Sequence, residues 1–205
     1  MNKSKDYPAS FWNERYGKKE FIYGTSPNKY FKQELDKLQP GIILIPAEGE
    51  GRNAVYAALQ GWDVTAFDIS EKGREKALHL AKDRKVSIQY DLTGVLEFES
   101  ETKFDVIGLS YAHFPADIRS KAHKHLLQFL KPGGVVIFEA FAKAQLGKIS
   151  GGPKKKEMLF SIEEVREEFK ELKFNYLEEE TIHLNEGDFH KGKANVIRFI
   201  GFRTY

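Results

Sequence analysis

The stretch IPAEGEGRNAVYAALQGWDVTAFD, residues 45–68, decides the fold class of this chain. A β-branched run over residues 42–47 leads into a turn with two glycines, and apolar residues at helical spacing follow over residues 52–60. A second apolar run, residues 63–67, ends on Asp68. A buried strand, a glycine turn, a helix and another buried strand form the repeating unit of a parallel sheet with helices on its faces.

The rest of the chain continues this alternation. Three further strands are expected at residues 86–90, 104–110 and 135–141. Helices are expected from Ser70 to about Lys82, from Pro115 to Leu130 with residues 131–134 ending it, and after a capping box of Ser161 and Glu164. Residues 174–184 and 194–203 read as an antiparallel hairpin. We therefore expect an α/β fold with a doubly wound, seven-stranded mixed sheet: five parallel strands, a C-terminal antiparallel hairpin, and helices on both faces.

Composition narrows the possible functions. The chain has 205 residues, a net charge of +2 and no cysteine. We expect one domain, residues 1–205, without the large positive field that nucleic-acid or membrane partners require. Disulfides, thiolate metal sites and cysteine nucleophiles are excluded, and the six histidines do not cluster with carboxylates, so no metal is expected. The first residues lack the apolar core of a signal peptide, and a cytoplasmic location is expected.

The charges of the glycine turn indicate its ligand. Gly49, Gly51 and Ala54, with Asp68 further along, satisfy the relaxed dinucleotide-binding pattern, although a tight turn needs glycines even without a ligand. Glu48 and Glu50 would repel a pyrophosphate at this helix N-terminus. S-adenosylmethionine has no phosphate and carries an ammonium and a sulfonium. The acidic turn therefore favours S-adenosylmethionine over NAD.

Two more acids fit the same ligand. Asp68 ends the second strand, where its oxygens could accept hydrogen bonds from ribose hydroxyls. Asp91 follows the third expected strand, where it could accept from an adenine amino group. Each could instead be a helix cap or a turn residue. Because the acids follow consecutive strands, a shared ligand is the better interpretation.

The sequence resembles the class I S-adenosylmethionine-dependent methyltransferases, a Rossmann-like family. Within that family it is most similar to the tellurite-resistance and thiopurine methyltransferase group. The resemblance covers nearly the whole chain. It rests on residues 11–31, 47–70, 90–93, 104–115 and 130–141, with SGGPK (150–154) and EGDFHKGKANVIRF (186–199) also similar. By this resemblance, residues 1–38 form a cap segment and residues 39–205 the Rossmann-like core.

The resemblance also implies site residues. It places at the cofactor the glycine turn, the strand ends and two cap tyrosines, namely Glu48, Gly49, Glu50, Gly51, Arg52, Asp68, Ile69, Asp91, Leu92, Ser110, Tyr111, Tyr16 and Tyr23. The sequence departs from the family where Ile45 occupies the place of an acid and Ala47 that of the first glycine. Glu48 could compensate for the missing acid.

Two histidines are candidates for the acceptor side. His113 follows the fourth strand and is the best-placed candidate for a general base and a substrate contact, although a satisfied structural histidine is an equal alternative. His190, in the expected hairpin loop, could cover the substrate or be an ordinary loop residue. A thiolate acceptor would need no base.

We therefore expect a methyltransferase that uses S-adenosylmethionine and acts on a small molecule by in-line transfer, as a monomer or homodimer. Two alternatives remain open at this point: an NAD(P)-dependent oxidoreductase that uses the same turn, and a non-catalytic S-adenosylmethionine-binding protein.

Overall fold

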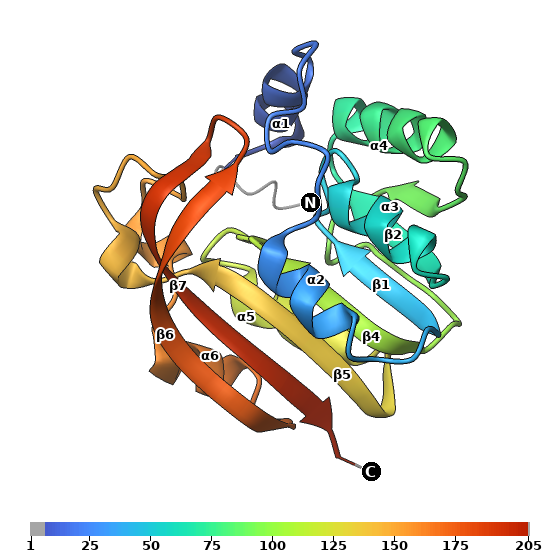
Figure 1. Ribbon diagram of the computed structural model, residues 1–205. Helices are drawn as coiled ribbons and strands as arrows, with labels where there is room; N and C mark the ends of the chain where they lie inside the picture. Colours follow the sequence, from blue (N-terminus) through green and yellow to red (C-terminus); the bar gives the residue numbers. More distant parts are fainter. Residues whose placement is uncertain (1–6, 205) are drawn as a thin grey trace.

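The computed structural model describes residues 7–204, and its centre is one seven-stranded sheet (Figure 1). The strand order is β3-β2-β1-β4-β5-β7-β6. The first five strands pair in parallel, whereas β7 pairs antiparallel with both β5 and β6. The predicted mixed sheet is confirmed. Its strands are β1 (Ile42–Pro46), β2 (Asp63–Asp68), β3 (Gln89–Leu92), β4 (Phe104–Ser110), β5 (Leu130–Phe141), β6 (Leu172–Glu186) and β7 (His190–Arg203).

Helices cover both faces of this sheet. On one face α2 (Lys29–Leu35), α3 (Arg52–Leu59) and α4 (Glu71–Asp83) enclose a core that includes Phe31 and Ala77. On the other face α5 (Arg119–Leu127) and α6 (Ile162–Glu168) enclose a second core with Phe138. Two short 3₁₀ turns, Lys143–Gln145 and Lys156–Met158, follow β5. The doubly wound arrangement buries apolar side chains on both sides of the central strands.

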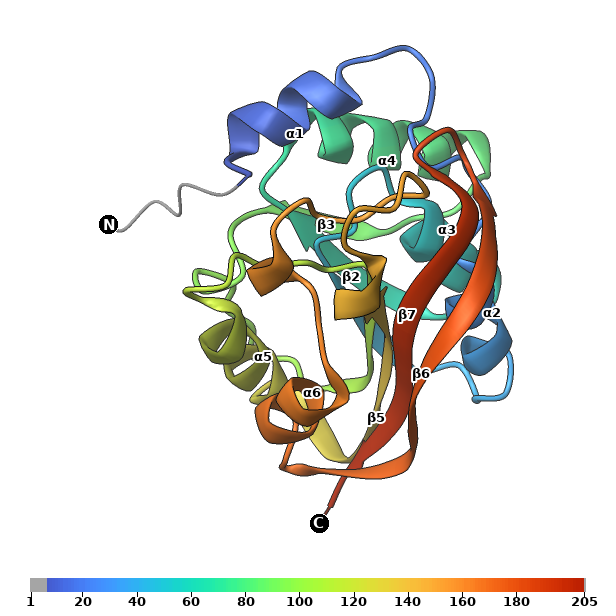
Figure 2. The same cartoon turned by 90° about the vertical axis from the view of Figure 1, so that its left-hand side faces the viewer.

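Helix α1 (Ala9–Tyr16) does not cover a face of the sheet. It packs against α4 and lies above the edge where the parallel strands end (Figure 2). The predicted cap, residues 1–38, contains α1 and α2, and its first six residues lie outside the described part of the chain. Division into cap and core stays a prediction.

Local signals place most helix starts where the sequence predicts them. The Ser70 hydroxyl accepts a hydrogen bond from the Gly73 amide and begins α4. Ser161 and Glu164 form the predicted capping box of α6.

Several predicted boundaries are wrong. Helix α5 begins at Arg119, because residues 115–118 form a turn in which the Ile118 amide donates to the Pro115 carbonyl. It ends at Leu127, and residues 131–134 belong to β5, where Leu130 pairs with Phe104 ahead of a register shift.

The third strand also lies later in the chain than predicted. Val86 donates its amide to the Ala81 carbonyl and so closes the end of α4, and β3 starts only at Gln89. Asp91 therefore lies inside β3, paired with Phe67, instead of following the strand.

None of the helices within residues 7–204 has the length and hydrophobicity that crossing a lipid bilayer would require.

Candidate functional site

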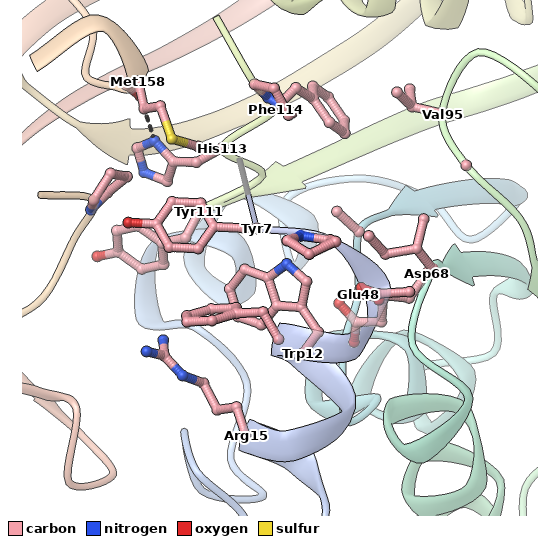
Figure 3. A pocket seen from close by; sticks show the side chains of 18 of the residues that line it. Tyr7, Trp12, Arg15, Glu48, Asp68, Val95, Tyr111, His113, Phe114 and Met158 are labelled. Atoms are coloured by element: carbon pink, nitrogen blue, oxygen red, sulfur yellow. Dashed lines mark hydrogen bonds between the residues drawn. The ribbon is translucent and has the colours of Figure 1, made fainter. Parts of the chain in front are cut away.

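A cavity of about 810 Å³ opens at the edge where β1, β2 and β4 end. Its wall comes from α1, the turns after β1 and β2, residues 93–97 after β3, residues 110–118 after β4, and residues 152–158 with His190. Figure 3 shows two groups of side chains in it, with Trp12 between them. We call Glu48 and Asp68 the acidic end, and Tyr111, His113, Phe141 and His190 the aromatic end.

Glu48 in the acidic end caps the helix that follows it. Its carboxylate accepts hydrogen bonds from the amides of Asn53 at 2.6 Å and Ala54 at 2.7 Å. Burial raises the pKa of Glu48 to about 7, because a carboxylate loses solvation inside the protein. Ala47, before it, has φ of 51°, a left-handed conformation that explains why glycine is usual at that position.

Asp68, the other acid of this end, binds the backbone on both sides. One oxygen accepts from the Gly49 amide at 3.0 Å, and the other accepts from the Ser70 amide at 2.9 Å. Burial raises the pKa of Asp68 to about 6. Neither Glu48 nor Asp68 forms an ion pair within the described residues. Two buried carboxylates thus line one end of the cavity without an ion pair among the described residues, although the Arg52 guanidinium is near enough to Glu48 to oppose the rise of its pKa.

The glycines of the turn serve close packing. Gly51 has φ of 88°, and a Cβ there would lie 2.5 Å from the Ala77 Cβ on α4. Gly49 has φ of 62°, and a Cβ there would lie 2.6 Å from the Tyr16 hydroxyl. Neither glycine lines the cavity, so they shape the turn instead of contributing to its wall.

The second acid of the turn has a different role from the predicted one. The Glu50 carboxylate accepts from the Ile22 amide at 2.8 Å and pairs with Lys76 at 2.7 Å. It fastens the segment after α1 to α4 and does not line the cavity. Of the two acids of the turn that were expected to face a cationic ligand, only Glu48 lines the cavity, and its contact with such a ligand stays a prediction.

Asp91 and Leu92 also fall outside the cavity wall, contrary to their predicted place beside the adenine. Leu92 is half exposed, and Asp91 accepts a hydrogen bond from Gln89 beside it in β3. The wall is formed instead by the next five residues, 93–97, together with Ile69. The late start of β3 explains the difference.

The aromatic end contains the predicted Ser110, Tyr111 and His113. Tyr111 has φ of 55°, and its ring stacks on Phe141 with centroids 4.6 Å apart. In Figure 3 His113 lies close to Met158, whose carbonyl its Nδ1 contacts at 2.8 Å. Its Nε2 accepts from the Phe141 amide at 3.2 Å.

These two contacts fix His113 in its neutral form. Burial lowers its pKa to about 4, and the Nε2 lone pair is already used by a backbone amide. A general base needs a free lone pair, so the structure does not support His113 as the catalytic base. It connects the residues after β4 with β5 and the loop at Met158.

His190, the other predicted histidine, lies in the same wall. Its ring is 4.5 Å from those of Tyr23 and Tyr111, centroid to centroid. Its Nδ1 is 3.7 Å from the Glu186 carboxylate.

The cap contributes more than the two predicted tyrosines. Tyr16 and Tyr23 line the cavity, and so do Trp12 and Arg15 from the same helix as Tyr16. The Arg15 guanidinium donates to the Tyr23 hydroxyl at 3.2 Å and lies over the Phe11 ring. Sequence reasoning missed Trp12 and Arg15, although the spacing of Trp12 and Tyr16, four residues apart, was a usable signal.

Arg52 and Lys154 complete the basic groups of the wall. Within the described part of the chain there is no group of three or more histidine and acidic side chains arranged to hold a metal ion.

Comparisons with known proteins give matches to methyltransferases. Residues 43–134 match a family model described as a methyltransferase domain. A Ubiquinone biosynthesis O-methyltransferase from Rickettsia prowazekii is 29% identical over 133 residues, which make up 64% of this chain and 50% of that protein. The chain spans about half the length of the curated relatives it matches.

Two solved structures show the same fold. TehB from Haemophilus influenzae has a TM-score of 0.72 and 16% identity, over 96% of this chain and 67% of that one. N-methyltransferase NodS from Bradyrhizobium japonicum, in complex with S-adenosyl-l-homocysteine, has a TM-score of 0.68 and 15% identity, over 98% and 100%.

Proposed function

We propose that this chain, whose residues 43–134 match a methyltransferase domain, is a class I S-adenosylmethionine-dependent methyltransferase that transfers a methyl group from S-adenosylmethionine to a small molecule. The observation that carries the proposal is the pair of buried, unpaired carboxylates, Glu48 and Asp68, at one end of a cavity whose other end is aromatic. The carboxylates favour a cationic ligand with hydroxyl donors, and the aromatic end has room for an acceptor.

The residues present fit this cofactor. Asp68 has oxygens with unused lone pairs that can accept from hydroxyl groups. Glu48, whose pKa is raised to about 7 without a ligand, would be drawn into its charged form by a bound cation. Arg15 has no carboxylate partner within residues 7–204 and is available for the cofactor's own carboxylate. When bound, the cofactor supplies a methyl group on a cationic sulfur. The chain's residues align the acceptor with it and exclude water.

A small acceptor is supported by the shape of the site. Helix α1 and the loop of residues 152–158 both contribute to the wall, so parts of the chain itself narrow the access to the cavity. Its aromatic rings suit a planar, apolar molecule.

Binding and catalysis can be tested separately. S-adenosylhomocysteine at 100 times its dissociation constant should stabilise the protein by about 2.7 kcal/mol, whereas NAD and NADP should leave its melting temperature unchanged. Transfer of a radioactive methyl group from S-adenosylmethionine to a panel of small acceptors then tests catalysis. Stabilisation by NAD instead would favour an oxidoreductase. Binding without transfer to any acceptor would indicate a non-catalytic binding protein.

A further inference from the structure

Two buried ionisable side chains meet at the turn of the β6–β7 hairpin. Glu186 ends β6 and His190 begins β7, and the two residues pair directly across the hairpin. Glu186 is 7% exposed and His190 5% exposed. The His190 ring lines the cavity, so this pair joins the aromatic end to the hairpin.

The Glu186 carboxylate is held in place from three sides. It forms an ion pair with Arg52 at 2.9 Å and accepts hydrogen bonds from the Asn28 side chain and the Lys29 amide, both at 3.3 Å. Burial alone would raise the pKa of Glu186, but His190 and Arg52 outweigh it and lower the pKa to about 2. Glu186 is therefore a fixed negative charge beside the imidazole.

His190 differs from the other histidine of the cavity in its free nitrogen. Both nitrogens of His113 are in hydrogen bonds, whereas the buried Nδ1 of His190 has no hydrogen-bond partner among the described residues and lies 3.7 Å from the Glu186 carboxylate. Catalytic hydrogen bonds are often this long before the substrate binds. A carboxylate beside one ring nitrogen favours the proton on that nitrogen and leaves the other as the acceptor.

We propose that His190, oriented by Glu186, takes up the proton of the methyl acceptor, so that the acceptor is a neutral hydroxyl or N–H compound and not a thiolate or other anion. This inference rests on the proposed methyl transfer. The acceptor's lone pair forms a bond to the methyl carbon, and the bond between that carbon and sulfur breaks with its electrons remaining on sulfur. The acceptor's proton moves to the imidazole, whose new positive charge is stabilised by Glu186, and is later released to water.

The surroundings of His190 keep it neutral before the reaction. Burial lowers its pKa, and Glu186 opposes that effect. The charged or titratable groups near it come from five parts of the fold: Arg15, Tyr23, Arg52, Tyr111, His113 and Glu186. A neutral imidazole at pH 7 can accept a proton, and activity should therefore fall as the pH falls through the pKa of His190.

The first test measures this titration directly and needs no known acceptor. Nuclear magnetic resonance would follow the His190 ring in the S-adenosylhomocysteine complex of the full chain as the pH is changed. Glu186→Gln should lower the His190 pKa by a unit or more, whereas His183→Gln, an exposed change on the same hairpin, should leave it unchanged. An unaltered pKa in Glu186→Gln would overturn the proposal.

The second test compares two probe acceptors, catechol for a neutral hydroxyl and thiophenol for a thiolate. His190→Gln should lower kcat for catechol by about 10²- to 10⁴-fold and change transfer to thiophenol by less than about fivefold. An equal loss for both probes, no loss for catechol, or methylation of thiophenol alone by the unmodified chain would overturn the inference.

The two proposals fail in different ways. If S-adenosylhomocysteine does not bind the unmodified chain, the proposed function fails. If it binds and methyl transfer survives in His190→Gln, only the proton acceptor is wrong.

Discussion

The two ends of the cavity are built in different ways. The acidic end comes from residues 47–68, one strand–turn–helix–strand unit, and both of its carboxylates bind backbone amides of that same unit. The aromatic end joins residues from after β4, from β5 and from the start of β7, which are held together by side-chain contacts over long sequence separations. Local backbone geometry therefore determines the first end, and tertiary packing determines the second.

The largest expected effect tests the close packing behind the acidic end. Gly51→Ala should lower the free energy of unfolding by about 3 kcal/mol, because the residue has φ of 88° and the new Cβ would lie 2.5 Å from Ala77. Gly147→Ala is the matched control, with φ of 83° but nothing within 4 Å, and should cost about 1 kcal/mol. Urea denaturation measures both. Equal losses would mean that the packing against α4 contributes nothing.

The next effect separates the two ends by ligand binding. Asp68→Ala should weaken S-adenosylhomocysteine binding about 100-fold, or about 2.7 kcal/mol, because a buried acceptor is lost and two backbone amides lose their partner. Met158→Leu, a change of similar volume beside His113, should alter the affinity by less than about threefold. Isothermal titration calorimetry measures both. If Met158→Leu weakens binding as strongly, the division of the cavity into two ends is wrong.

A smaller effect tests the structural role of His113. His113→Ala should cost about 2 kcal/mol at pH 7.5, because the Phe141 amide and the Met158 carbonyl lose their partner. The pKa of His113 is lowered to about 4, so its contribution is complete above about pH 6.5 and is lost as the pH falls toward 4.

The loss of unfolding free energy in His113→Ala, measured by urea denaturation, should therefore be smaller at pH 5 than at pH 7.5. His79→Ala, at an exposed position on α4, is the control and should have little effect at either pH. An equal loss of stability in His113→Ala at pH 5 and pH 7.5 would contradict the neutral, buried state of His113.

The smallest effect concerns Glu48. Its pKa is raised to about 7, so protonation of Glu48 stabilises the folded state. This stabilisation is lost as the pH rises through about 7. The ligand-free protein should lose about 1 kcal/mol between pH 6 and pH 8, and Glu48→Gln should remove that loss. Glu178→Gln, on the exposed side of β6, is the control. Urea denaturation at the two pH values measures the loss of stability. If the loss is unchanged in Glu48→Gln, another group is responsible for it.

The same difference between the ends explains what could be predicted from the sequence. Glu48 and Asp68 line the cavity where the sequence suggested a site, because a strand, a glycine turn and a helix fix the positions of their neighbours, and their contact with the cofactor stays a prediction. Glu50 was assigned to the ligand incorrectly, because its partner, Lys76, lies on another helix. The position of Asp91 was predicted incorrectly because the start of β3 was. Val86 looks like a strand residue in the sequence, but its amide closes the end of α4.

The aromatic end could be predicted only in part. His113 follows a strand, which is visible in the sequence, but its two backbone partners are not. The pairing of His190 with Glu186 depends on the register of the hairpin turn, and Arg52 reaches that pair from α3. Such contacts join residues far apart in the chain, and no local pattern indicates them.

The hairpin turn also sets the order in which the cavity can form during synthesis. The acidic end is complete once residues 47–68 and the helix behind them, α4, have emerged, but His190 follows Asp83, the last residue of α4, by about 107 residues. At about 5–20 residues per second, a growing chain would hold the first end for roughly 5 to 20 seconds before the second could close. The aromatic end of the cavity is thus completed only when β7, which begins with His190, has been made.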